Sequence, residues 1–116
     1  MVGMNMNQSE TKDFYCDFVL DNKISVEKLV ETENVLAFYH TKPSWTFHVV
    51  IVPKKHVSNL VELGNMDLIK EIFEIASAII IEKGLDNTNY KIITNGGDFQ
   101  DSKHLHFHLV SGSKIV

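Results

Sequence analysis

The stretch 104–110 reads His-Leu-His-Phe-His-Leu-Val and alternates strictly between histidine and apolar residues until its last position. Successive side chains of a β-strand point to opposite faces of a sheet, so this alternation predicts a strand, which we place at 103–110. The leucine and phenylalanine side chains would share the face that packs on the core. The histidines His104, His106 and His108 would stand in a row on the other face, about 7 Å apart.

Three imidazoles on one face indicate chemistry, because a buried, hydrogen-bonded histidine explains one such residue but not three in register. Two interpretations stay open at this point. The first is a metal site on these three histidines, because neutral imidazole is a common zinc ligand. The second is phosphoryl or nucleotidyl transfer, in which one imidazole attacks phosphorus and its neighbours donate hydrogen bonds to phosphate oxygens.

The rest of the chain supplies one helix and four further strands. Apolar residues recur at three- and four-residue spacing over 66–83, which predicts a helix with Asn65 as its N-cap and Gly84 just after its end. The run 14–20 is expected to form a short N-terminal helix or turn, although an edge strand fits its pattern too. Short apolar and β-branched runs predict strands at 26–31, 35–40, 46–52 and 89–94. This order favours an α+β fold, an antiparallel sheet of about five strands with one long helix.

The composition limits the classes of function. The chain has 116 residues and a formal net charge of -4, and all 11 of its cationic side chains are lysines. An acidic chain without arginine lacks the basic patch of proteins that bind nucleic-acid polymers. We expect residues 1–12 to form a flexible tail and 13–116 to form a single domain. No apolar run is long enough for a membrane span and no signal peptide is recognisable, so a cytoplasmic protein is expected.

Four motifs, in this order along the chain, resemble those of the histidine-triad (HIT) family, most closely its Hint-like, bacterial branch. The stretch 104–110 is similar to the family signature, and 52–57, Val-Pro-Lys-Lys-His-Val, is similar to a segment at the end of the family's central strand. Val-Leu-Ala-Phe at 35–38, and Asn95 together with Gln100, are similar to two further motifs. The resemblance covers most of the chain and implies a HIT-like fold.

The resemblance implies a homodimer that binds a small-molecule nucleotide. Such a protein cleaves a phosphoramidate or phosphoanhydride bond, as nucleoside phosphoramidases and dinucleoside polyphosphate hydrolases do. By motif position, His106 is the nucleophile that forms a nucleotidyl-histidine. His108 and His56 contact the phosphate oxygens, and His104 orients His106 or assists the leaving group. We expect no metal and no other cofactor.

The resemblance also implies a substrate pocket. Asn95 and Gln100 match positions that hold the phosphate or the leaving side of the substrate. Five aromatic residues match positions that line the base pocket in the family: Phe14, Tyr15, Phe18, Phe38 and Tyr39.

Several positions depart from the family pattern. His40 stands where the family binds ribose with an aspartate, and an imidazole does not accept two hydroxyl protons as a carboxylate does. Phe99 replaces a glycine, and Asp101 replaces the serine or threonine that assists the leaving group. His40 and Asp101 remain candidate substrate-binding residues. Asp13 and Cys16 stand where some bacterial members carry a zinc-binding Cys-x-x-Cys pair, so no structural zinc is expected.

Two alternatives to a nucleotide hydrolase or transferase stay open. The departures at His40, Phe99 and Asp101 allow a nucleotide-binding module without catalysis. The three-histidine strand, taken alone, allows a metal-binding protein. His48 lies inside the apolar run 46–52, and we interpret it as a buried histidine with satisfied hydrogen bonds rather than as a ligand.

Overall fold

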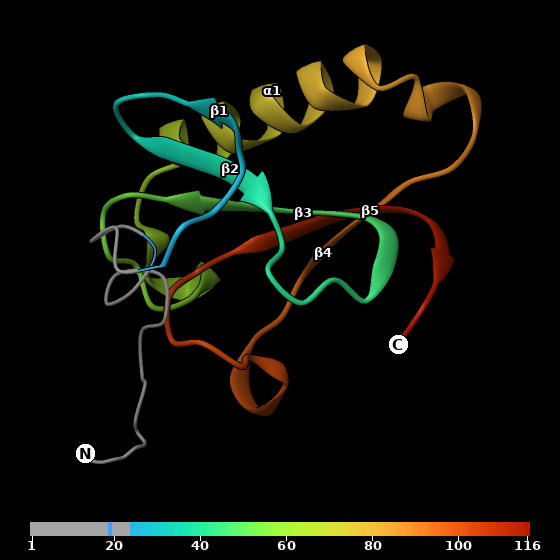
Figure 1. Cartoon of the computed structure of the whole chain (residues 1–116). Coiled ribbons are helices and arrows are strands. Elements are labelled where there is room, and N and C mark those ends of the chain that lie inside the picture. The colour runs from blue at the N-terminus through green and yellow to red at the C-terminus, as the bar shows by residue number, and fades with distance from the viewer. Residues whose placement is uncertain (1–18, 20–23) are drawn as a thin grey trace.

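The computed structural model describes Val19 and residues 24–116, which build one antiparallel sheet with a helix packed on it. The five strands have the order β1-β2-β3-β5-β4, and every neighbouring pair is antiparallel (Figure 1). The elements are β1 (Lys28–Glu31), β2 (Val35–Tyr39), β3 (Trp45–Pro53), α1 (Asp67–Glu82), β4 (Lys91–Thr94) and β5 (Phe107–Lys114), with short 3-10 helices at Leu60–Leu63, Leu85–Asn87 and Gly97–Phe99. The predicted α+β class with five antiparallel strands is confirmed.

Two of the expectations fall outside the described residues. These are the flexible tail at 1–12 and the short N-terminal helix or turn at 14–20, of which only Val19 is described. Within the described part, no helix combines the length and the apolar character that crossing a bilayer would require.

The helix begins and ends close to the predicted residues. Asn65 does not occupy the N-cap position itself, which is Met66, but its Oδ1 accepts a hydrogen bond of 2.7 Å from the Asp67 N–H. This bond satisfies one of the N–H groups that the first helical turn leaves without an intrahelical partner. Gly84 follows the helix with a φ of 68°, a left-handed conformation that glycine adopts without a steric penalty.

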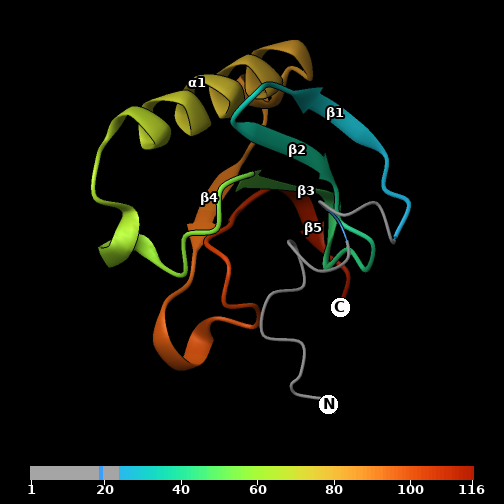
Figure 2. The same cartoon turned by 90° about the vertical axis from the view of Figure 1, so that its left-hand side faces the viewer.

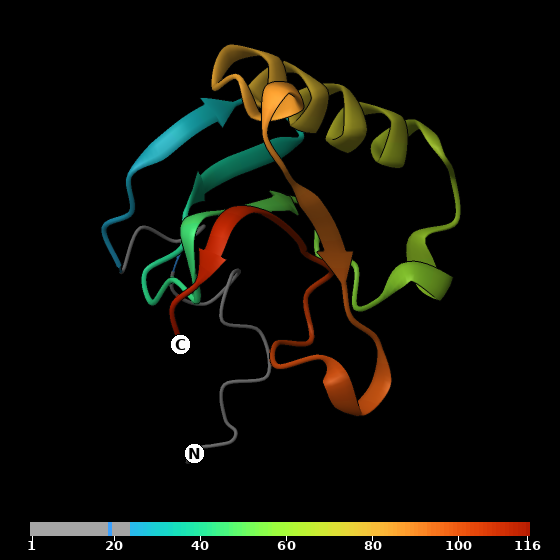
Figure 3. The same cartoon turned by 90° about the vertical axis from the view of Figure 1, so that its right-hand side faces the viewer.

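α1 covers one face of the sheet in all three views (Figure 1, Figure 2 and Figure 3). The side chains between helix and sheet form one buried cluster, to which α1 contributes Ile72, Ala76 and Ile79. Leu105, Phe107 and Leu109 belong to the same cluster, as the alternation of the stretch 104–110 predicts. Burial of apolar surface on this scale is the main stabilising contribution to the fold.

The opposite face of the sheet is also covered near its centre. Leu36, Phe38, Val50 and Val52 form a second buried cluster there, so β2 and β3 are buried on both faces. Because Val50 of β3 lies opposite His108 of β5, the histidine shares this second face. The sheet therefore separates the core under α1 from the face that carries the polar site.

One prediction about β5 is wrong: the strand begins at Phe107, so His104 and His106 precede it. The β3–β5 register pairs Ile51 with Phe107, which would place Leu105 opposite Pro53. Proline has no N–H, so the ladder cannot continue there. The Leu105 N–H donates instead to the carbonyl oxygen of Val57, at 2.6 Å.

The other end of β5 reaches Lys114, four residues beyond the prediction. Its polar residues Ser111 and Gly112 do not look like a strand in sequence. They pair with the start of β3 across a register shift, and Gly112 has a φ of 82°. A Cβ at Gly112 would lie 1.9 Å from Thr46 Oγ1, so this close approach needs a glycine.

Candidate functional site

The segment before β5 places His104 and His106, here called the histidine pair, in the interior. His104 is 0% exposed and its Nε2–H donates to the carbonyl oxygen of Pro53 at 2.6 Å. The His106 Nδ1–H donates to the carbonyl oxygen of His104 at 2.8 Å. Because a carbonyl oxygen only accepts, Nδ1 of His106 carries the proton. A neutral His106 ring therefore has its lone pair on Nε2.

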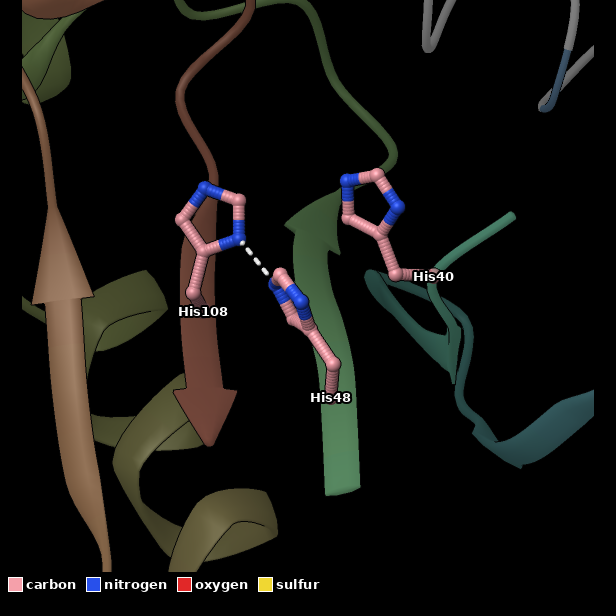
Figure 4. A group of neighbouring side chains, drawn as sticks. All are labelled: His40, His48 and His108. Carbon is pink, nitrogen blue, oxygen red and sulfur yellow. Dashed lines mark hydrogen bonds between the residues drawn. The ribbon is translucent and has the colours of Figure 1, made fainter. Parts of the chain in front are cut away.

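Three further histidines, His40, His48 and His108, lie together on the face of the sheet away from α1 and are here called the histidine cluster. Figure 4 shows His48 on β3 between the rings of His108 on β5 and His40, which follows β2. The ring centroids lie 4.5 Å apart for His40 and His48, 5.0 Å for His48 and His108, and 6.0 Å for His40 and His108.

A backbone amide decides how the protons are placed in this cluster. The Ser44 N–H donates to Nδ1 of His48 at 3.0 Å, so the proton of a neutral His48 ring is on Nε2. This Nε2–H donates to Nδ1 of His108 at 2.9 Å (Figure 4). The proton of a neutral His108 ring is therefore on Nε2, and His108 is a hydrogen-bond donor at that atom.

His40 is oriented in the same way. The Lys42 N–H donates to Nδ1 of His40 at 2.9 Å, so a neutral His40 ring also carries its proton on Nε2. Among the described residues, Nε2 of His40 and Nε2 of His108 have no hydrogen-bond partner. Both rings are half-buried.

Burial keeps the cluster neutral at physiological pH. Burial, with a smaller contribution from neighbouring histidines, lowers the pKa of His108 to about 3 and that of His48 to about 4. Burial, and repulsion between the protonated forms of His40 and His106, also lower the pKa of His40, while the nearby Asp101 carboxylate acts in the opposite direction. The three rings therefore act as neutral donors and acceptors.

The cluster is also the one group of three or more potential metal ligands among the described residues, with ligand atoms within 4.8 Å of one another. A histidine that binds a metal through one nitrogen usually donates a proton from the other to an oxygen acceptor. In His40 and His48 this other nitrogen is Nδ1, and it accepts from a backbone N–H instead. The donor set therefore fits a metal poorly. The alternative of a metal on His104, His106 and His108 required all three side chains on one face of a strand. Only His108 lies in β5, so this condition is not met.

Two predicted site residues lie beside the histidine pair. The exposed His56 ring stands 5.4 Å from that of His104, and its Nε2 is 3.2 Å from Ser58 Oγ. Gln100 is buried and its amide donates to the Ser58 carbonyl oxygen at 2.6 Å. Gln100 thus holds the segment that carries His56.

A cavity of about 400 Å³ borders the histidine cluster. It brings together predicted residues from distant parts of the chain, and its lining includes His40, Lys42, Asn95, Asp101, His108 and Lys114. Phe99, which replaces the glycine of the family pattern, is 81% exposed outside this lining. Its side chain therefore does not close the cavity.

The predicted base pocket is described only in part, because Phe14, Tyr15 and Phe18 lie outside the described residues. Phe38 is buried in the apolar cluster away from α1, whereas Tyr39 packs against the core under α1 and contacts Phe47 edge-on. Neighbouring strand residues point to opposite faces, so these two cannot line one pocket together.

His48 is the residue whose part in the site the sequence analysis missed. The interpretation of a buried, hydrogen-bonded histidine is correct as far as it goes, because His48 is 6% exposed. Its partner, however, is His108, a member of the site. The apolar run around His48 contains no sign of this contact. Only the pairing of β3 with β5 brings the two residues together.

Comparison with known proteins gives a consistent result. Residues 21–115 match the family model described as HIT domain. An uncharacterized HIT-like protein of Rickettsia prowazekii is 29% identical over 103 residues, which are 84% of this chain and 86% of that protein.

Solved structures agree with this match. A histidine triad protein from Clostridium difficile has a TM-score of 0.79 and 32% identity, covering 97% of both chains. A HIT family hydrolase from Legionella pneumophila has a TM-score of 0.79 and 26% identity, covering 90% of this chain and 96% of that one. A histidine triad nucleotide-binding protein from Candida albicans has a TM-score of 0.74 and 28% identity, covering 84% of this chain and 72% of that one.

Proposed function

Because the chain belongs to the HIT domain family, we propose that it is a nucleotide hydrolase or transferase in which His106 is the nucleophile. The proposed substrate is a nucleoside phosphate with a phosphoramidate or phosphoanhydride bond. The names of two similar proteins, a HIT family hydrolase and a histidine triad nucleotide-binding protein, support this class. We also propose that the protein is a cytoplasmic homodimer, in line with the family resemblance.

The observation that carries the proposal is the hydrogen bond from His106 Nδ1–H to the His104 carbonyl oxygen. It places the lone pair of neutral His106 on Nε2, which is the atom that would attack phosphorus. A bond between Nε2 and phosphorus forms as the bond from phosphorus to the leaving group breaks. The leaving group departs with the electron pair of the broken bond. Water or another acceptor then attacks phosphorus and displaces Nε2, and a neighbouring base takes the proton of the attacking hydroxyl group.

The second part of the proposal concerns charge on the phosphate oxygens. His108 stands beside His106, with ring centroids 5.0 Å apart, and its Nε2 is a donor without a partner among the described residues. We propose that this N–H binds a phosphate oxygen and stabilises the charge that develops there. His56 stands beside His104 and is proposed to contact the phosphate as well.

Turnover of adenosine phosphoramidate by the wild type and by His106→Ala tests the proposal. We expect wild-type turnover and loss of turnover in the variant. We also expect a nucleotidyl adduct on His106 in mass spectrometry of protein denatured at alkaline pH, because acid cleaves the P–N bond of such an adduct. Equal unfolding temperatures of the two proteins serve as the control for folding. Comparable turnover in both would remove His106 as nucleophile. Calorimetric nucleotide binding without product, over a panel that includes dinucleoside polyphosphates, would favour the non-catalytic binding module.

A further inference from the structure

We propose that the cavity beside His40 binds a second anionic group of the substrate, a phosphate, next to the phosphoryl group attacked by His106. The substrate class is then a phosphoanhydride or bisphosphate compound rather than a substrate with a single phosphate. That extension rests on the proposed function, whereas binding of an anion in the cavity is measurable without turnover.

The first step is the polarity of His40. Its Nδ1 is occupied as an acceptor by the Lys42 N–H, so only an Nε2–H remains to meet a ligand. An imidazole N–H only donates, so it binds a ligand through an acceptor such as a phosphate oxygen. A group that needs to donate hydrogen bonds finds no acceptor on this ring.

The second step is that two such donors border one space. His108 presents an Nε2–H for the reason given above, and both His40 and His108 line the cavity of about 400 Å³. Their ring centroids are 6.0 Å apart. Two N–H donors on neighbouring rings that border one cavity suit oxygens of two adjacent phosphates, one held by each ring.

The third step is charge. Lys42 and Lys114 line the same cavity, and neither forms a salt bridge within the described part of the chain. Asp101 is a carboxylate in this lining and opposes them. With neutral histidines, two ammonium groups against one carboxylate leave the lining positive, although the whole chain is acidic. An anion is the ligand that this balance attracts.

Isothermal titration calorimetry with inorganic pyrophosphate and inorganic phosphate tests the proposal on the wild-type protein. We expect pyrophosphate to bind at least about tenfold more tightly, because it occupies both donors. His40→Phe keeps an aromatic ring without the N–H and is expected to weaken pyrophosphate binding about tenfold. Lys42→Met and Lys114→Met should each weaken it about threefold, because exposed ammonium groups are screened by solvent.

Two further variants make the test independent of damage to the fold. Asp101→Asn removes the opposing charge at an exposed position and is expected to tighten pyrophosphate binding. Lys70→Met removes an exposed lysine on α1, outside the cavity lining, and should change nothing.

The proposal is overturned if pyrophosphate binds no better than phosphate, or if His40→Phe and Asp101→Asn bind it as the wild type does. It is also overturned if the wild type binds Zn²⁺ tightly and His40→Phe does not. In that case His40 would present a lone pair to the cavity rather than an N–H. If His106 proved not to be the nucleophile, all of these binding results would stay the same. The two proposals can therefore be disproved independently of each other.

Discussion

The histidine pair and the histidine cluster use the same side chain with opposite polarity. In the pair, His104 and His106 donate to backbone carbonyl oxygens, which leaves a lone pair on Nε2 of His106. In the cluster, backbone N–H groups donate to Nδ1 of His40 and His48, which leaves N–H groups on His40 and His108. The backbone partner, and not the spacing of the histidines, therefore decides which ring presents a lone pair and which presents an N–H.

The largest expected effect is a difference in turnover between variants of His106, the proposed nucleophile, and His108, the proposed hydrogen-bond donor. His106→Ala should lower turnover of a nucleoside phosphoramidate by about three orders of magnitude or more, because no covalent route remains. His108→Ala removes one donor to the phosphate and should lower it about a hundredfold. Steady-state kinetics of both variants measures the ratio. A greater loss in His108→Ala would break the distinction between the two rings.

The next effect concerns stability of the pair. His104→Ala leaves a void at a fully buried position and deprives the Pro53 carbonyl of its donor. We expect the free energy of unfolding to fall by about 2–4 kcal/mol. Urea denaturation measures it, and His56→Ala, at an exposed position beside His104, is the matched control with little expected change. A change in His104→Ala as small as in the control would contradict the structural role of this ring.

A pH dependence should arise from the cluster. The pKa values of His48 and His108 are lowered from 6.5 to about 4 and about 3 in the folded chain. Below about pH 6.5 the unfolded chain therefore binds more protons at these two histidines than the folded chain does. The free energy of unfolding is highest above this pH and declines as the pH falls toward 4 and 3. The slope cannot exceed about 1.4 kcal/mol per pH unit for each group, because each group binds at most one proton, and partial exposure of His108 makes its share smaller.

Urea unfolding at several pH values tests this dependence. His48→Asn should flatten the decline below pH 6.5, whereas His56→Ala should keep it. An identical decline in His48→Asn and the wild type would show that the cluster does not cause it.

The smallest change removes one backbone N–H. Ser44→Pro deletes the donor to Nδ1 of His48 and leaves the rings in place. The His48 proton is then free to move to Nδ1, which would turn His108 into the donor of their shared bond. Nitrogen NMR of the histidine rings reports the tautomers directly. Ser44→Ala, which keeps the N–H, should retain the wild-type pattern, and an unchanged pattern in Ser44→Pro would disprove the control by this amide.

Sequence predicts the parts of this molecule that depend on local periodicity. The helix is within one residue at each end, because its apolar spacing and the flanking Asn65 and Gly84 are local signals. The alternation of 104–110 also places its three apolar side chains correctly in the core. Local periodicity does not indicate at which residue the hydrogen-bonded pairing of two strands ends.

The errors follow from contacts between distant segments. His104 and His106 continue the alternating pattern, yet they leave the sheet because of a proline about fifty residues earlier. His48 joins the site through the register of β3 against β5, and no residue near it in sequence indicates this. The roles of Asn95, Gln100 and the aromatic residues remain predictions.

Pro53 bears on which substitutions this chain can tolerate. Backbone N–H and C=O groups of one strand residue point to the same neighbouring strand, and the Pro53 carbonyl faces His104. Any other residue at this position would add an N–H directed at Leu105, and regular pairing could then run on through 104–106. The chain would gain a longer strand and lose the arrangement around His106. Because proline has no N–H, its carbonyl oxygen is left to accept from His104, and residues 104–106 keep their conformation outside the sheet.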